Sequence, residues 1–365
     1  MRTRRPLLLV ATIAIVATLA AWLHPWSRAR LTGVATVAEG FGAPIVRPLA
    51  PTVSVHTTRL ADTEVDVYVG GDTAPVLVLV PGAVPAGRDD ERVRRLAHVL
   101  ARAERRVVVP ELAVYDERLV EEDVSLLVDL VVELSSDGGE VAFVGISFGG
   151  SLALVAAADP AVDGRLAGVA TFGAHADLVG VLQAATTGVS VVGGDTIPWD
   201  ADPRAQEVVR DKLTGLLAPD QADAVRAALD SDGSAGLSPG AEAVRRLLAN
   251  DDPRRTYELA DALPAPIRAR LASVSPVAVA DQLGDVPIVA MHSREDRVIP
   301  YGELLRLGTA LPHARLLTVD SLAHAELELT DPGGWIGALD DLWTTWSFTG
   351  RALHWQEPTW PWGDG

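Results

Sequence analysis

Short apolar runs alternate with amphipathic segments over the first half of the chain. Continuous apolar runs are typical of strands buried on both faces of a parallel sheet, and they occur at residues 75–81, 106–110, 140–145 and 166–172. Apolar positions recur at helical spacing in residues 89–103, 117–134 and 148–158. Residues 52–60 and 63–69 favour a β-hairpin ahead of the first buried strand. This alternation predicts an α/β fold with a mostly parallel, doubly wound sheet.

The alternation stops between about residues 173 and 284. That stretch has no strong strand pattern, and helical patterns fill residues 203–217, 219–229, 239–250 and 264–273. Strand and helix patterns then resume at residues 286–291, 301–311, 314–319 and 334–346. An insertion of about 110 mostly helical residues predicts a cap over the carboxyl edge of the sheet.

The N-terminus carries a membrane signal. Residues 7–23 contain no charge, and as a helix they would be about 26 Å long, near the short limit for spanning a bilayer. Arg2, Arg4 and Arg5 precede the run, so the positive-inside rule keeps the N-terminus in the cytoplasm and exports the rest. We therefore expect one transmembrane helix that anchors an extracytoplasmic domain. A cleaved signal peptide, which would give a secreted protein, is the alternative.

These patterns divide the chain into five parts. Residues 1–27 are the anchor or signal segment, and residues 28–51, rich in proline and glycine, are a linker. Residues 52–174 and 285–350 make the α/β core, and residues 175–284 make the helical cap. Residues 351–365 are a tail rich in tryptophan and proline, which either touches the bilayer interface or folds back on the domain.

Charge and cysteine content exclude several functions. The formal net charge is -18, from 49 acidic and 31 basic residues, and such a surface repels nucleic acid. The chain has no cysteine, which excludes disulfides, thiolate nucleophiles and zinc–thiolate sites. We expect no metal or cofactor, and the sequence does not give the oligomeric state.

The strongest chemical signal is the segment Gly145-Ile146-Ser147-Phe148-Gly149. It lies between an apolar strand and a helix of small residues. Glycines on both sides of a serine permit a tight strand-to-helix turn that lifts the hydroxyl above the sheet. The N-terminus of the following helix would help to stabilise a developing oxyanion. Ser147 is therefore the candidate nucleophile; a glycine-rich helix entry with a capping serine is the alternative.

A serine nucleophile needs a base and an acid. Among eight histidines, His324 follows the last predicted strand, where a loop would face the edge of the sheet that carries Ser147. Asp296 lies in the segment after the strand that ends at Met291, and Glu295 is its rival. The order Ser147, Asp296, His324 agrees with one known arrangement of the serine triad along a chain.

The oxyanion hole needs two converging backbone N–H groups. One should come from Phe148, directly after the serine. The other should come from Ala83, because Pro81 has no N–H and Gly82 lets the backbone approach closely. A plain turn after the strand is the alternative.

With these residues in place, the chain resembles the α/β-hydrolase superfamily over roughly residues 60 to 348. The resemblance rests on the turn at Ser147, the Pro81-Gly82 loop, the segment from Arg294 to Pro300 and the Ala323-His324 loop. It implies a catalytic triad of Ser147, Asp296 and His324, with oxyanion N–H groups from Phe148 and Ala83. Many relatives carry His-Gly where this chain has Pro81-Gly82.

The resemblance implies acyl chemistry, and we expect a carboxylesterase acting on a small-molecule or lipid-like ester through an acyl-enzyme. Two alternatives stay open: an acyltransferase of the cell envelope with the same triad, and a non-catalytic binding protein on a hydrolase scaffold.

Overall fold

The computed structural model describes residues 52–71, 74–113, 122–231, 236–320, 335–353 and residue 355. The expected membrane segment and the linker lie outside these residues. Within the ranges just given, no helix combines the length and the hydropathy that crossing a membrane requires.

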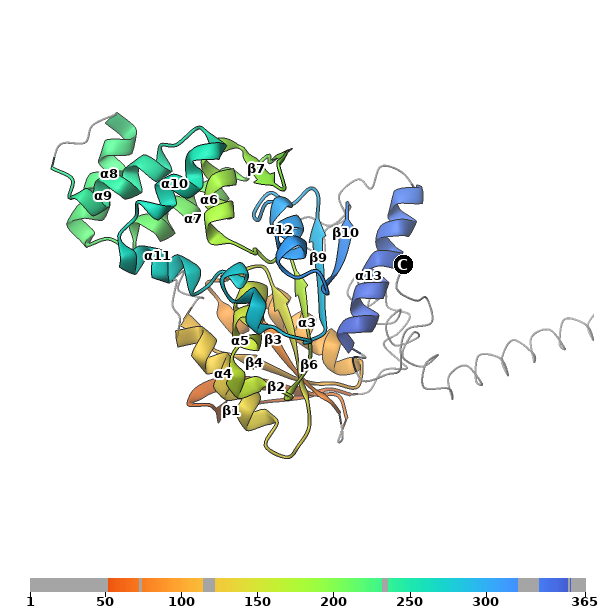
Figure 1. The fold of residues 1–365 in the computed structure, drawn as a ribbon. Helices are drawn as coiled ribbons and strands as arrows, with labels where there is room; N and C mark the ends of the chain where they lie inside the picture. Colours follow the sequence, from red (N-terminus) through yellow and green to blue (C-terminus); the bar gives the residue numbers. More distant parts are fainter. Residues whose placement is uncertain are drawn as a thin grey trace, which may run out of the picture.

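A mixed, mostly parallel sheet forms the centre of the molecule (Figure 1). Over the described residues it has eight strands in the order β1-β2-β4-β3-β5-β6-β9-β10. Their bounds are β1 Ser54–Leu60, β2 Thr63–Val69, β3 Val76–Val80, β4 Arg106–Pro110, β5 Val141–Ile146, β6 Leu166–Phe172, β9 Ile288–Ser293 and β10 Arg315–Val319. The strands β1, β2 and β4 pair antiparallel, and every pairing from β4 to β10 is parallel.

Helices cover both faces of this sheet, as the doubly wound prediction requires. Successive side chains of a strand point to opposite faces. In β3, Leu77 and Leu79 pack in one apolar core with α3 (Glu91–Arg102) and α13 (Trp335–Leu353). Val78 and Val80 pack in a second core on the other face, with α4 (Glu122–Leu134), α5 (Phe148–Ala157) and α12 (Gly302–Ala310).

The order of the strands fixes where a ligand can approach. The chain passes from β3 to β4 on one side and then crosses back to β5 on the other side. Strand order therefore reverses between β3 and β5, and crevices in α/β sheets open at the carboxyl ends of the strands at such a point. Pro81 follows β3 and Ser147 follows β5, so both residues lie at this reversal.

The segment between β6 and β9, here called the insertion, extends beyond the sheet and has a core of its own (Figure 1). Its helices are α6 Leu178–Thr187, α7 Pro203–Thr214, α8 Pro219–Ser231, α9 Pro239–Leu248, α10 Thr256–Asp261 and α11 Ala265–Ala272. Leu213, Val244 and Leu247 lie fully buried at its centre. The 3-10 segment Pro276–Gln282 then returns the chain to the sheet.

Two features differ from the sequence prediction. The insertion contains a hairpin of β7 (Val189–Val192) and β8 (Asp195–Pro198), where no strand was expected. The final helix continues past residue 346 to Leu353.

Trp355 of the tail folds back on the domain, since a Cβ placed on Gly168 of β6 would lie 2.5 Å from its ring. Trp360 and Trp362 lie outside the described residues.

Candidate active site

Ser147 occupies a strained turn between β5 and α5. Its φ is 53° and its ψ is -132°. Residues other than glycine rarely adopt a positive φ of this kind. Such strain costs of order 1–3 kcal/mol and persists where surrounding contacts enforce it. Here the Ser147 N–H donates to the carbonyl of Phe172 at 2.7 Å, and its carbonyl accepts from Gly150 at 2.9 Å. The turn predicted from the sequence is confirmed.

Positions 145 and 149, on either side of Ser147, must be glycine because neighbouring backbone atoms leave no room for a Cβ. A Cβ on Gly145 would lie 2.4 Å from the Gly150 Cα, and one on Gly149 would lie 2.2 Å from the Pro81 carbonyl oxygen. The backbone of α5 therefore packs directly against the backbone of β5 and of the loop after β3, with no side chain between them. Any larger residue at Gly145 or Gly149 would push the turn apart.

The loop after β3 passes directly beside the serine side chain. A Cβ on Gly82 would lie 2.9 Å from the Ser147 Cβ and 3.3 Å from its Oγ. Ala83 comes next and is half-buried, and its N–H has no hydrogen-bond partner among the described residues. Phe148 is the first residue of α5, and a first helical N–H has no acceptor within its helix. Phe148 thus follows Ser147 directly, and Ala83 follows Gly82, which lies against Ser147. The role of Phe148 and Ala83 as oxyanion donors stays a prediction.

Asp296 lies in the turn after β9 and is buried, whereas its rival Glu295 is exposed. The Asp296 Oδ1 accepts the N–H groups of Val298 at 2.8 Å and Ile299 at 2.9 Å. Strands β5, β6 and β9 are parallel neighbours, so the turn at Asp296 shares the carboxyl edge with Ser147. Two strand spacings separate the ends of β5 and β9 by about 10 Å, which an imidazole between two side chains can bridge.

His292 is a partner of Asp296 that sequence analysis did not identify. Its buried Nε2 lies 3.2 Å from the Asp296 Oδ2 and 3.0 Å from the Ile299 carbonyl oxygen. Because a carbonyl oxygen only accepts, Nε2 carries a proton and donates. The spacing of four residues between His292 and Asp296 was visible in the sequence, but a histidine at the end of a strand gave no reason to expect this contact.

His324 lies outside the described residues, and its distance from Ser147 and Asp296 stays a prediction. The chain can be followed to Asp320, four residues before it. There the Arg294 N–H donates to the Val319 carbonyl at 3.0 Å, and Arg294 pairs with Asp320 at 2.8 Å. The strand β10 therefore ends beside the turn that carries Asp296.

A different serine–histidine contact occurs at Ser151 and His175. The Ser151 Oγ lies 2.8 Å from the His175 Nδ1, and the His175 Nε2 donates to the Val274 carbonyl at 2.9 Å. Both side chains are fully buried, and burial lowers the pKa of His175 to about 4. This contact ties α5 to the two ends of the insertion and has no access for a substrate, so we assign it a structural role.

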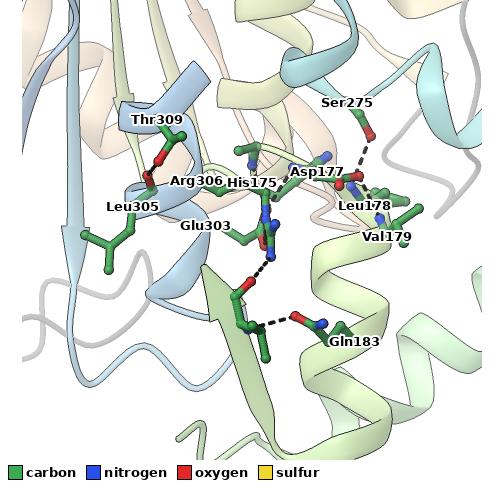
Figure 2. A network of polar contacts seen from close by, with 12 residues as sticks. His175, Asp177, Leu178, Val179, Gln183, Ser275, Glu303, Leu305, Arg306 and Thr309 are labelled. Atoms are coloured by element: carbon green, nitrogen blue, oxygen red, sulfur yellow. Dashed lines mark hydrogen bonds and ion pairs between the residues drawn. The ribbon is translucent and has the colours of Figure 1, made fainter. Parts of the chain in front are cut away.

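A buried polar network fixes the base of the insertion (Figure 2). Glu303 of α12 is fully buried, and its Oε2 accepts the N–H groups of Ala176 at 3.0 Å and Asp177 at 2.8 Å. Its Oε1 accepts from Arg306 at 3.3 Å, and Arg306 also donates to the Val191 carbonyl of β7 at 3.2 Å. Burial raises the pKa of Glu303 to about 7.

The same network holds both ends of the insertion together. Asp177 caps α6 through the Val179 N–H and accepts the Tyr257 hydroxyl at 2.8 Å. Ser275, at the exit from the insertion, accepts the Leu178 N–H at 3.0 Å. The entry and exit segments of the insertion are thus joined directly beside α12.

The insertion also reaches the serine turn. Lys212 of α7 places its ammonium 5.8 Å from the centre of the Phe148 ring, within the range of a cation–π contact. The ring of Phe148 lies 5.1 Å from that of His175. The side chain of Lys212 therefore extends from α7 to the start of α5. Among the residues the structure describes, no three metal-ligating side chains are grouped as a metal site would need.

Comparison with known proteins gives distant structural likeness. No protein-family model matches the chain, and no curated protein matches it either. An esterase/lipase from an uncultured bacterium is 13% identical, with 82% of each chain covered and a TM-score of 0.46. The 2-hydroxy-6-oxo-6-phenylhexa-2,4-dienoate hydrolase of Rhodococcus sp. strain RHA1 is 21% identical over 75% of this chain and 93% of its own, with a TM-score of 0.42.

Acylaminoacyl peptidase of Pyrococcus horikoshii is 14% identical and covers 87% of this chain, with a TM-score of 0.48. This chain spans 44% of that peptidase's length. At these identities, what the chain does has to be argued from its own site.

Proposed function

We propose that this chain is a serine hydrolase of the α/β-hydrolase type that cleaves carboxylic esters through an acyl-enzyme. The observation that carries the proposal is the strained Ser147, half-exposed at the carboxyl edge where strand order reverses, with Gly82 pressed against it. A buried, hydrogen-bonded Asp296 at the same edge supports it. A strained backbone is retained at a functional position when the surrounding structure enforces it.

In the proposed reaction, the Ser147 Oγ attacks the ester carbonyl carbon while its proton passes to His324. The N–H groups of Phe148 and Ala83 stabilise the oxyanion. His324 then gives its proton to the alkoxide oxygen as the C–O bond breaks, and the alcohol leaves an acyl group on Ser147. Water attacks this acyl group, His324 takes a proton from the water and returns it to Ser147, and the acid leaves. Asp296 orients His324 and stabilises its charged form throughout.

The insertion would cover this site and exclude water from it. Two contacts support that role: Lys212 over the Phe148 ring, and the network at Glu303 that fixes the insertion to α12. The acyl chain of a substrate would then lie between the insertion and the carboxyl edge of the sheet.

Two measurements on the purified chain test the proposal: hydrolysis of a panel of nitrophenyl esters and peptides, and labelling by a fluorophosphonate probe. We expect ester hydrolysis and labelling, both lost in Ser147→Ala. Hydrolysis of peptides without esters would move the substrate class to amides. Transfer to an added alcohol that outruns hydrolysis would favour the acyltransferase alternative. A folded protein that is neither labelled nor active would favour the binding-protein alternative.

We also propose that residues 7–23 anchor the chain in the membrane with the catalytic domain outside the cytoplasm. The support is the uncharged run and the three arginines before it. Fractionation of cells that express the full chain, with and without residues 1–27, tests this. Loss of membrane association on truncation is expected, and a cleaved mature form in the medium would establish secretion instead.

A further inference from the structure

The insertion is hydrogen-bonded to the turn that carries Asp296. The Trp199 Nε1 donates to the Asp296 carbonyl oxygen at 2.8 Å, a buried contact between residues 97 positions apart in the chain. Three residues further on, the Asp202 N–H donates to the Arg297 carbonyl at 2.7 Å. Residues 199–202 join β8 to α7, so these bonds connect the insertion to the peptides at 296 and 297.

Trp199 is itself firmly placed. Its backbone N–H donates to the Gly188 carbonyl at 2.8 Å, at the end of α6, and its side chain is buried. The Gly188 carbonyl belongs to the left-handed residue that ends α6, so the indole is held by the framework of the insertion. The donor to Asp296 therefore moves only if the insertion moves.

The Asp296 carboxylate is held from the opposite direction, by the core. The N–H groups of Val298 and Ile299 and the Nε2 of His292 surround it. The core thus fixes the side chain of Asp296, and the insertion fixes its carbonyl. If the carbonyl were released, the peptide could rotate and carry the carboxylate with it.

We propose that Trp199 is a positioning residue, through which the insertion orients the Asp296 carboxylate toward the base. This inference rests on the proposed function, in which Asp296 is the catalytic acid. It makes the insertion a part of the catalytic apparatus as well as a wall of the pocket. A displacement of about 1 Å in a catalytic group can cost as much as a hundredfold in rate, so losing one hydrogen bond here should be measurable.

The test compares Trp199→Phe with Trp199→His. Both variants shorten the indole to a single ring; the phenyl ring keeps more of its volume, whereas the imidazole Nε2 takes the place of the indole Nε1 and keeps a donor. Trp355→Phe is the matched control, because the buried Trp355 Nε1 has no hydrogen-bond partner among the described residues. Values of kcat and KM are measured for nitrophenyl acetate, butyrate and octanoate, with near-ultraviolet circular dichroism to establish the folded fraction.

We expect Trp199→Phe to lower kcat about tenfold on all three esters, with KM changed less than about twofold. Trp199→His should recover most of this loss, and Trp355→Phe should resemble the wild type. Since the acetate needs little of the pocket, a loss that is equal for acetate and octanoate reports on the acid and not on the pocket.

Two results would overturn the inference while leaving the hydrolase proposal intact: equal kcat values for the Phe and His variants at 199, and a loss confined to the KM for octanoate. Full activity of Asp296→Asn would overturn the inference together with the role of Asp296 in the proposed reaction. An inactive wild type, unlabelled by a fluorophosphonate probe, would instead remove the proposed function on which the inference depends.

Discussion

Ser147, the proposed nucleophile, leaves no room for a side chain at Gly82. A methyl group there would lie 2.9 Å from the Ser147 Cβ, closer than real Cβ contacts allow, so either the loop or the serine must shift. We expect Gly82→Ala to lower kcat/KM for esters at least about a hundredfold, because a shift of this size misaligns attack and oxyanion binding. Gly139→Ala is the matched control, since a Cβ at Gly139 meets nothing within 4 Å. Steady-state kinetics of both variants check the expectation, which fails if they are equally active.

The buried His292 Nε2 donates to the Ile299 carbonyl at 3.0 Å and lies 3.2 Å from the Asp296 Oδ2. Removing the imidazole in His292→Leu leaves the Ile299 carbonyl without this donor, which costs about 1–3 kcal/mol of stability and loosens the turn that carries the proposed acid Asp296. His292→Gln keeps a side-chain N–H at a similar reach. We predict a lower kcat in the Leu variant with partial recovery in the Gln variant, measured alongside thermal unfolding. Equal kcat values in the two variants would mean that His292 serves the fold alone.

The insertion was only partly predictable from the sequence because its smallest elements lie among helices. The strands β7 and β8 have four residues each, too few for a period-two pattern to stand out. The pair Gly193-Gly194 is the feature of the sequence that could have predicted this hairpin. Both residues adopt positive φ, 60° and 94°, as a tight turn between short strands requires. Reading that Gly-Gly pair as a hairpin turn would have identified the two strands.

Helix α12 holds the insertion through a carboxyl group that titrates near neutrality. The pKa of Glu303 rises from 4.5 to about 7 in the folded chain, so the folded state binds this proton more tightly than the unfolded state does. Its contribution to stability is complete below about pH 4.5 and is lost as the pH rises through 7. Glu303→Gln removes this dependence.

Relative to the wild type, Glu303→Gln should therefore gain stability between pH 5 and pH 8, by up to about 3 kcal/mol for this fully buried group. Denaturant unfolding of both proteins at each pH measures the difference. His175 contributes a slope of opposite sign, since its pKa falls to about 4, and this slope cancels in the comparison. If the difference in the free energy of unfolding between the two proteins does not change with pH, the pKa of Glu303 is not raised by folding.

At the scale of the whole molecule, the α/β fold and the edge that carries the candidate site could be predicted from the sequence. Buried strands appear as continuous apolar runs, and glycines on both sides of Ser147 permit the tight strand-to-helix turn that the structure has. The contacts made by His292 and Trp199 could not be predicted in the same way. They join residues by side-chain geometry at the ends of separate elements, and neither the hydropathy pattern nor a local motif encodes which carbonyl an indole will meet.

The proposed reaction requires that Ser147 becomes acylated. Intact-mass analysis of the wild-type chain, quenched during turnover of a nitrophenyl ester, tests this most directly. We expect a species heavier by one acyl group, with the added mass on the peptide that contains Ser147 and no such species in Ser147→Ala. Ester turnover with no acylated species under any quench condition, or with the acyl group on another residue, would contradict it.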